Sequence, residues 1–197
     1  MNGMRMMMKS DKADRRVKYT KMVLQDSLVG LLKQKPITKI SIKEICEAAD
    51  INRSTFYAHY VDQYDLFNQI QQAFFNEINE YLRDYNIKEY EAESLQTMQR
   101  IFDYITENAE LCKVMLGEHG DIELQKQVMM IVQRQCMKEW QGVNQIDGEM
   151  MEYLYLFATN GSIGIVQQWL QSGMKKSTRE MAELVIKLAY RGYSAFI

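Results

Sequence analysis

Apolar residues in this chain recur at intervals of three and four, the spacing that places side chains on one face of an α-helix. Alternation with a period of two, which would indicate strands, is hard to find, and the chain has one proline and ten glycines to interrupt helices. We therefore predict an all-α fold of about nine helices. Besides two short helices within 41–60 and a longer one from about 65, the pattern predicts helices at 13–33, 95–108, 109–116, 122–140, 149–171 and 178–196.

Residues 41–60 have the outline of a helix-turn-helix. Ser41 and Glu44 form a capping box, in which the hydroxyl accepts from the amide of residue 44 and the carboxylate accepts from the amide of residue 41. The first helix ends at Asp50, and Asn52 is a good N-cap for the second. The pattern therefore predicts two short helices joined by a tight turn.

The second of these helices begins with groups that suit a polyanion. Arg53, Ser54 and Thr55 offer a guanidinium and two hydroxyls before the helix becomes apolar. Such a first turn can meet phosphates or base edges in the major groove of DNA. The alternative is a solvated helix start, because short amphipathic helix pairs are common in all-helical proteins.

The segment 40–67, ISIKEICEAADINRSTFYAHYVDQYDLF, resembles the DNA-binding domain of TetR-family transcriptional regulators. The positions that match the family pattern are Ala48, Ala49, Ser54, Thr55, Phe56, Tyr57, Tyr60, Asp65 and Leu66. The resemblance implies a three-helix DNA-binding domain with an N-terminal arm at 1–65 and a helical ligand-binding and dimerisation domain at 66–197. It also implies a double-stranded DNA operator as partner.

The residues that the resemblance implies for DNA binding are Thr38, Lys39, Ser41, Arg53, Ser54, Thr55, Tyr57, His59, Tyr60 and Gln63. Arg53 to Thr55 and Tyr57 would lie near bases or phosphates, and the others would anchor phosphates. Gln63 stands where the family often has lysine, so its phosphate contact would be weaker and uncharged. Asp50 stands where the family often has glycine, but aspartate tolerates left-handed backbone conformations.

Charge is distributed unevenly along the chain. The net charge of −2 argues against nucleic acid by itself, but residues 1–65 hold 12 Lys and Arg against 8 Asp and Glu, whereas residues 66–197 hold 12 against 18. The basic first dozen residues are expected to form a mobile arm, which either follows phosphates or is a solvated tail. The asymmetry is modest and supports a DNA-reading head attached to a second domain.

The last two predicted helices carry small residues at helical spacing. The predicted dimer interface consists of Leu154, Ala158, Gly161, Ile165, Trp169, Val185, Leu188 and Gly192. Two such helices could meet their symmetry mates in a four-helix bundle, or pack inside one protomer. The run 157–188 is similar to the C-terminal half of a TetR subgroup in which these helices dimerise, which favours a homodimer.

Soft and aromatic side chains in the central helices suit an apolar ligand pocket. The candidate lining residues are Phe102, Tyr104, Met115, Met129, Met137 and Tyr155. Ordinary core packing explains the same residues, so a small-molecule effector is an implication of the resemblance.

Residues for catalysis, metal binding or a cofactor are not evident. His59 and His119 stand outside any recognisable catalytic motif, and the three cysteines lack C-x-x-C spacing. We therefore predict no enzyme, no cofactor and no metal, the alternative being a metal or redox sensor that uses Cys112, His119 and Cys136. No apolar run is long enough for a signal peptide or a membrane span, so a cytoplasmic protein is expected.

These features together predict a homodimeric transcriptional repressor that a small molecule releases from a palindromic operator. The alternative from another class is a helical interaction or adaptor module that keeps the fold and has lost DNA binding.

Overall fold

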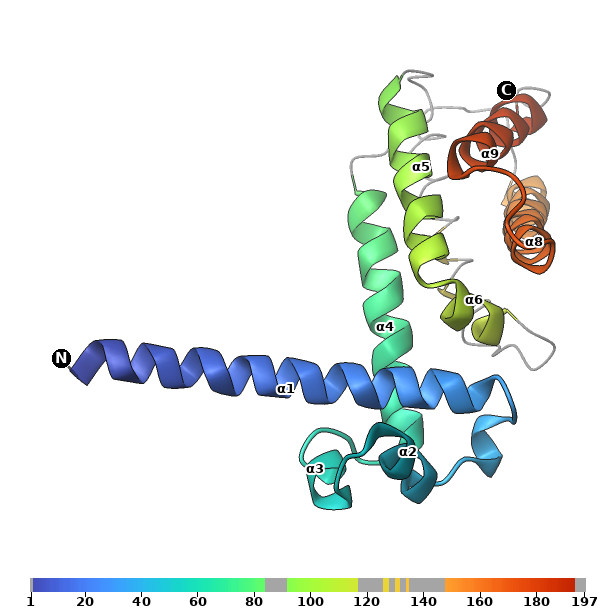
Figure 1. Cartoon of the computed structure of the whole chain (residues 1–197). Helices are drawn as coiled ribbons and strands as arrows, with labels where there is room; N and C mark the ends of the chain where they lie inside the picture. The colour runs from blue at the N-terminus through green and yellow to red at the C-terminus, as the bar shows by residue number, and fades with distance from the viewer. Residues whose placement is uncertain are drawn as a thin grey trace. The chain divides into compact units, whose positions relative to one another are not determined.

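The computed structural model describes residues 2–83, 92–116, 126–127, 130–131, 134 and 148–193, and every element in them is helical (Figure 1). This confirms the all-α prediction. The elements are α1 (Asn2–Leu32), the 3-10 helix η1 (Ile37–Lys39), α2 (Ile42–Ala49), α3 (Arg53–Tyr57), α4 (Gln63–Tyr81), α5 (Ala92–Glu107), α6 (Ala109–Met115), α8 (Gly148–Gln171) and α9 (Thr178–Tyr193). Of the helix predicted at 122–140, the few described residues are helical.

The chain divides into two compact units within α4. Unit 1 comprises Met1–Ala73 and unit 2 comprises Phe74–Ile197. The polar stretch 84–94 lies mostly outside the described residues, and its last residues begin α5. None of the described helices combines the length and the apolar character that a membrane crossing requires.

Helix α1 begins at Asn2, so the predicted arm is the first part of a helix. The arm prediction was wrong because residues 4–16 contain no glycine or proline and are mostly good helix formers. The inward face of α1 is set by Thr20, Leu24 and Leu28, which are buried, whereas Val17 is 39% exposed. These three residues are four apart, and α1 packs on α2.

The core of unit 1 gathers side chains from four helices and the loops between them. Its fully or almost fully buried residues are Leu24, Leu28, Ile40, Ile45, Cys46, Phe56, Tyr60, Leu66 and Ile70. Each large apolar side chain removed from water contributes about 1.5–3 kcal/mol. Because α2 and α3 are too short to be stable alone, this shared core holds them in place.

Unit 2 is built on the packing of α5 along α9, with α6 against α5 and α8. The ring of Phe102 meets the edge of Trp169, with centroids 5.3 Å apart, and the Trp169 indole N–H donates to the Lys176 carbonyl at 2.9 Å. Helix α8 ends at Gln171, and Gly173, two residues further on, has φ 77°, in the left-handed region that favours glycine. Ser177 and Glu180 then form a capping box at the start of α9: the Ser177 N–H donates to the Glu180 carboxylate at 2.7 Å, and the Glu180 N–H donates to the Ser177 hydroxyl at 3.3 Å.

Candidate functional site

The predicted capping box at the start of α2 is confirmed. The Ser41 hydroxyl accepts the Glu44 N–H at 3.3 Å, and the Ser41 N–H donates to the Glu44 carboxylate at 3.0 Å. The same hydroxyl donates to that carboxylate at 2.9 Å. Ser41 is exposed, but its polar groups are already engaged in the cap, so it has little left to offer a phosphate.

Glu44 also bonds Lys35, which precedes η1. Its carboxylate therefore contacts both ends of the segment 35–41, and the exposed Thr38 and Lys39 lie between these ends. The hydrogen bond from Lys35, followed by those from Ser41, lowers the pKa of Glu44 to about 2. This carboxylate thus fixes the segment 35–41, whose η1 helix presents two of the predicted phosphate anchors.

The turn between α2 and α3 forms as predicted. Asp50 has left-handed backbone angles, φ 54° and ψ 42°, a conformation that aspartate tolerates better than most residues. Asn52 then caps α3, because its side-chain oxygen accepts the Ser54 N–H at 3.1 Å and the Ser54 hydroxyl at 3.2 Å.

The outward face of α3 consists of the predicted base- or phosphate-contacting residues. Arg53 and Ser54 are exposed, and Tyr57 is 57% exposed although its ring meets the edge of Phe56 with centroids 5.7 Å apart. Phe56 is fully buried and holds the opposite face of α3 in the core. Thr55 is half-buried, as is His59 just after the helix.

Tyr60 lies in the core, which corrects its expected place at the surface. It is only 3% exposed, and its ring packs against Phe56 with centroids 5.6 Å apart. Burial raises the pKa of its phenol. Because Tyr60 follows Phe56 by four residues, the two side chains turn to the same side of the chain, so we exclude Tyr60 from the candidate interface.

Gln63 is the first residue of α4 and is half-buried. Two carboxylates order this helix start: Asp62 accepts the Asp65 N–H at 2.8 Å, and Asp65 accepts the Val61 N–H at 2.9 Å. The bond from Val61 lowers the pKa of Asp65. A phosphate that approached Gln63 would therefore meet a neutral amide beside two anions.

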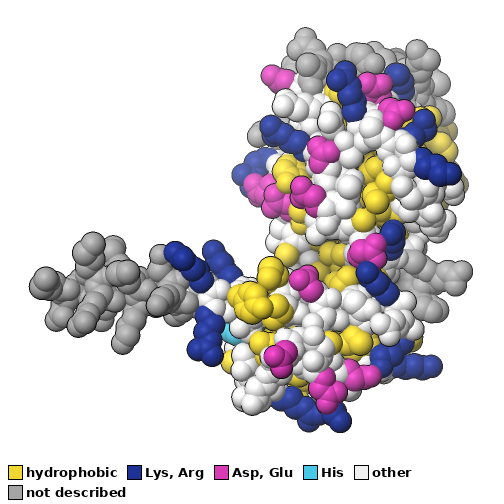
Figure 2. Space-filling view, in the orientation of Figure 1, with side chains coloured by type: hydrophobic (Ala, Val, Ile, Leu, Met, Phe, Trp, Pro, Cys, Tyr) yellow, Lys and Arg dark blue, Asp and Glu magenta, His cyan; other side chains and the backbone are white. Residues whose placement is uncertain are grey.

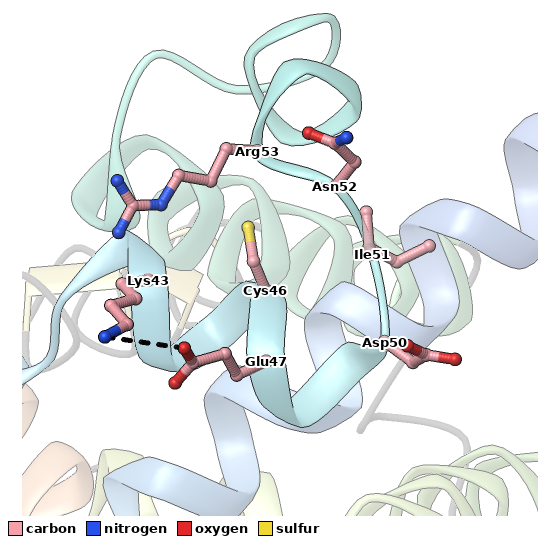
Figure 3. A pocket seen from close by; sticks show the side chains of 7 residues that line it. All are labelled: Lys43, Cys46, Glu47, Asp50, Ile51, Asn52 and Arg53. Carbon is pink, nitrogen blue, oxygen red and sulfur yellow. Dashed lines mark ion pairs between the residues drawn. The ribbon is translucent and has the colours of Figure 1, made fainter.

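A cleft of about 540 Å³ opens between α2 and the start of α3 (Figure 3). It is lined by Lys43, Cys46, Glu47, Asp50, Ile51, Asn52 and Arg53. Figure 3 shows the side chains of Lys43 and Arg53 on the same side of this cleft, and Lys43 is ion-paired with Glu47 at 3.6 Å. Lys43 therefore adds a second exposed cation beside Arg53.

Lys43 was missed from the sequence because the periodicity marks it only as solvated. A search for exposed cations on the first helix of the pair, next to the turn that leads to Arg53, would have found it. Further Lys and Arg side chains group on the described part of α1, where Arg15, Arg16 and Lys18 are exposed (Figure 2).

Unit 2 contains an apolar pocket of about 190 Å³ between α4, α5, α6, α8 and α9. Of the predicted lining residues, Phe102 and Met115 line it. Tyr104, whose ring stacks on Phe74 with centroids 5.2 Å apart, and the buried Tyr155 are not among its lining residues. Met129 and Met137 lie outside the described residues, as do His119 and Cys136 of the sensor alternative.

The predicted dimer residues differ in their exposure to solvent. Leu154 and Trp169 are buried within their own protomer, whereas Ala158, Gly161, Ile165 and Val185 are half-buried and Leu188 is 53% exposed. Of Gly192 only the helical backbone is described. The large apolar side chains that α8 and α9 leave exposed are Met150, Tyr153, Leu156, Phe157, Leu184 and Leu188, which we call the exposed apolar face. Most of these were not predicted, because α8 is apolar on both sides.

Comparisons with known proteins fit this architecture. The family model TetR_C_8, transcriptional regulator C-terminal region, matches residues 92–191, which is half of the chain. A comparison with curated protein sequences gives no match.

Solved structures of similar fold cover both units. A TetR transcriptional regulator from Streptococcus agalactiae has a TM-score of 0.63 at 17% identity, over 91% of this chain and 98% of that one. The fatty acid degradation regulator FadR from Bacillus halodurans has a TM-score of 0.64 at 14% identity, over 86% and 93%. FadR from Bacillus subtilis, in complex with stearoyl-CoA, has a TM-score of 0.62 at 16% identity, over 85% and 96%.

Proposed function

This chain belongs to the TetR family of transcriptional regulators, and on that premise we propose that it is a homodimeric repressor which a small molecule releases from a palindromic DNA operator. The outward face of α3 is the observation that carries the proposal. Arg53, Ser54 and Tyr57 stand exposed on a capped helix whose opposite face is held in the core by Phe56. The large aromatic ring of Tyr57 leaves apolar surface in contact with water, which is unfavourable in free energy. Contact of this ring with base edges would remove that surface from water.

We call the outward face of α3, with Arg53, Ser54 and Tyr57, the reading face, and phosphate contacts would surround it. Thr38 and Lys39 are exposed in η1, within the segment 35–41 that Glu44 fixes, and Lys43 is exposed at the rim of the cleft. Each phosphate that a Lys or Arg neutralises releases counterions, so affinity should fall steeply with salt. Base contacts from Arg53, Ser54 and Tyr57 would supply sequence preference.

Dimerisation would pair two reading faces. The exposed apolar face of α8 and α9 includes Phe157, which is 73% exposed, and Leu188. Uncovered apolar patches of this kind mark association surfaces, and most homo-oligomers have two-fold symmetry. A two-fold dimer would present its two α3 helices to half-sites about one helical turn apart, and the operator would then be a pseudo-palindrome.

The pocket of unit 2 supports a ligand-responsive regulator. Its walls include residues of α4, the helix that continues from the reading unit. A ligand that binds one dimer state better than the other would shift the population toward the first. Release of DNA requires that the favoured state match the operator poorly.

Selection of bound fragments from the source genome, starting with DNA upstream of neighbouring genes, tests the proposal. We expect a palindromic fragment that the intact protein binds in a salt-sensitive manner and that Arg53→Ala and Tyr57→Ala variants bind more weakly while they remain folded. Transcription from the selected promoter should rise when the protein is removed. Absence of binding to any DNA at low salt would favour the interaction or adaptor module instead.

A further inference from the structure

We infer that the pocket of unit 2 takes a compact, uncharged and largely apolar molecule of about six to eight heavy atoms, such as a monocyclic aromatic hydrocarbon. The inference rests on the proposed ligand response and narrows it to one class of ligand.

Size is the first argument. A protein cavity of about 150 Å³ lined by leucine, isoleucine and phenylalanine binds benzene. The pocket here measures about 190 Å³, enough for a ring with one or two substituent carbons. A stearoyl chain has about three times as many carbons as benzene and would exceed this space.

The chemistry of the walls is the second argument. Aromatic rings of Phe74, Phe75 and Phe102 face aliphatic chains such as those of Ile105 and Val166. Among the described lining residues the only polar side-chain groups are the Ser162 hydroxyl and the Cys112 thiol, and none is charged. A carboxylate or phosphate buried here would lose its hydration with no cation among those residues to replace it.

The Cys112 side chain does not change this chemistry. The thiol is 4.0 Å from the Ile105 carbonyl oxygen, and burial raises its pKa to about 12. It is therefore protonated and neutral at physiological pH, and contributes a small, polarisable surface.

The walls are held by contacts behind them, which makes the pocket preformed. Phe102 rests against Trp169, whose indole N–H bonds the backbone at Lys176. Phe74 stacks on Tyr104 at 5.2 Å and meets Phe75 edge-on at 5.5 Å. A preformed apolar pocket avoids much of the ordering cost of binding, which favours small ligands that gain little from each contact.

Titration calorimetry of the full chain with toluene, and separately with stearoyl-CoA, tests the inference. We expect toluene to bind with a negative heat-capacity change and to raise the thermal midpoint by roughly 3–6 °C at ten times its Kd. Stearoyl-CoA should bind at least tenfold more weakly, or not at all. Tighter binding of stearoyl-CoA, or absence of toluene binding, would overturn the inference.

Two variants place the ligand. Val166→Phe fills the pocket from α8. Ser162→Leu fills it less and replaces the first variant if that variant fails to fold. Gln168→Phe, at an exposed position of the same helix, is the matched control. Toluene affinity should fall at least tenfold in both filling variants and stay unchanged in the control, whereas equal affinity in all would overturn the site.

Operator binding, measured in parallel, separates this inference from the proposed function. If toluene binds but leaves operator affinity unchanged, the ligand class stands and the proposed release mechanism fails. If stearoyl-CoA lowers the affinity for operator DNA and toluene does not, the release mechanism stands and the ligand class is overturned.

Discussion

The two units present different surfaces for different reasons. In unit 1, side-chain caps such as Ser41, Asn52 and Asp62 order short helices, and what remains exposed on α3 is mainly polar and aromatic. In unit 2, the long helix α8 buries Leu154 on one side and exposes Phe157 on another. The surface of unit 1 needs no second protomer to cover it, and it suits a polar, charged partner. The surface of unit 2 leaves apolar area exposed to water, and a second apolar surface would cover it.

The largest effect should come from the core beneath the reading face. Phe56→Ala removes a fully buried ring, so we expect unit 1 to lose about 3–5 kcal/mol of stability. Urea unfolding followed by circular dichroism measures this loss. The neighbour Tyr57→Ala, whose ring is mostly exposed, should change stability by no more than about 1 kcal/mol and serves as the control. Equal losses in both variants would contradict the assignment of inner and outer faces on α3.

The exposed apolar face should be sensitive to charge. A Phe157→Glu, Leu188→Glu double variant places carboxylates where the proposed dimer buries apolar side chains, so we expect dissociation to monomers in sedimentation at micromolar concentration. Glu152→Lys, at an exposed position of α8, is the control and should stay dimeric. A double variant that sediments like the wild type would show that this face is not the interface.

The proposed phosphate contact of Lys39 should affect the salt dependence of DNA binding rather than the stability of the fold. Lys39→Ala removes one exposed cation per protomer, so the slope of log affinity against log salt should become shallower by about 2 for a dimer. Anisotropy titrations of operator DNA at several salt concentrations give this slope. Lys113→Ala, in unit 2, should leave the slope unchanged.

The smallest effect concerns pH. The pKa of Glu44 is lowered to about 2, so its ionised form stabilises the fold above the ordinary pKa of 4.5 and this contribution is lost as pH falls from about 4.5 to about 2. Glu44→Gln should therefore flatten the dependence of the thermal midpoint on pH in that window. Glu47→Gln, on the same helix, is the control, because Glu47 pairs with Lys43 across an exposed surface.

The sequence predicted unit 1 well because its signals are local. A cap and the amide it bonds are two or three residues apart, as in Ser41 with Glu44 and Asn52 with Ser54, so spacing alone reveals them. The left-handed turn at Asp50 follows from the same local chemistry. Tyr60 was misplaced because its burial depends on packing around Phe56, which spacing does not report.

In unit 2 the sequence located α5, α6, α8 and α9 to within a few residues, but it did not distinguish inside from outside. The sequence pattern does not show whether an apolar residue is covered by its own core or by a partner. Trp169, which is buried, was therefore assigned to the interface, and Phe157, which is exposed, was not. The pocket prediction was confirmed for Phe102 and Met115, which line the cavity, whereas Tyr104 and Tyr155 are not among its lining residues, because the spacing of apolar residues does not report which cavity a side chain borders.

Operator binding by the wild type and by Arg53→Ala, compared at about 50 and 200 mM salt, tests the central claim most directly. Arg53 is exposed on the reading face and lies in the cleft wall, so its loss should leave folding intact. The account predicts salt-sensitive binding of the wild type and a loss of affinity of about 1–3 kcal/mol per half-site in the variant. Equal affinities of the two proteins, or no binding of the wild type at the lower salt concentration, would contradict it.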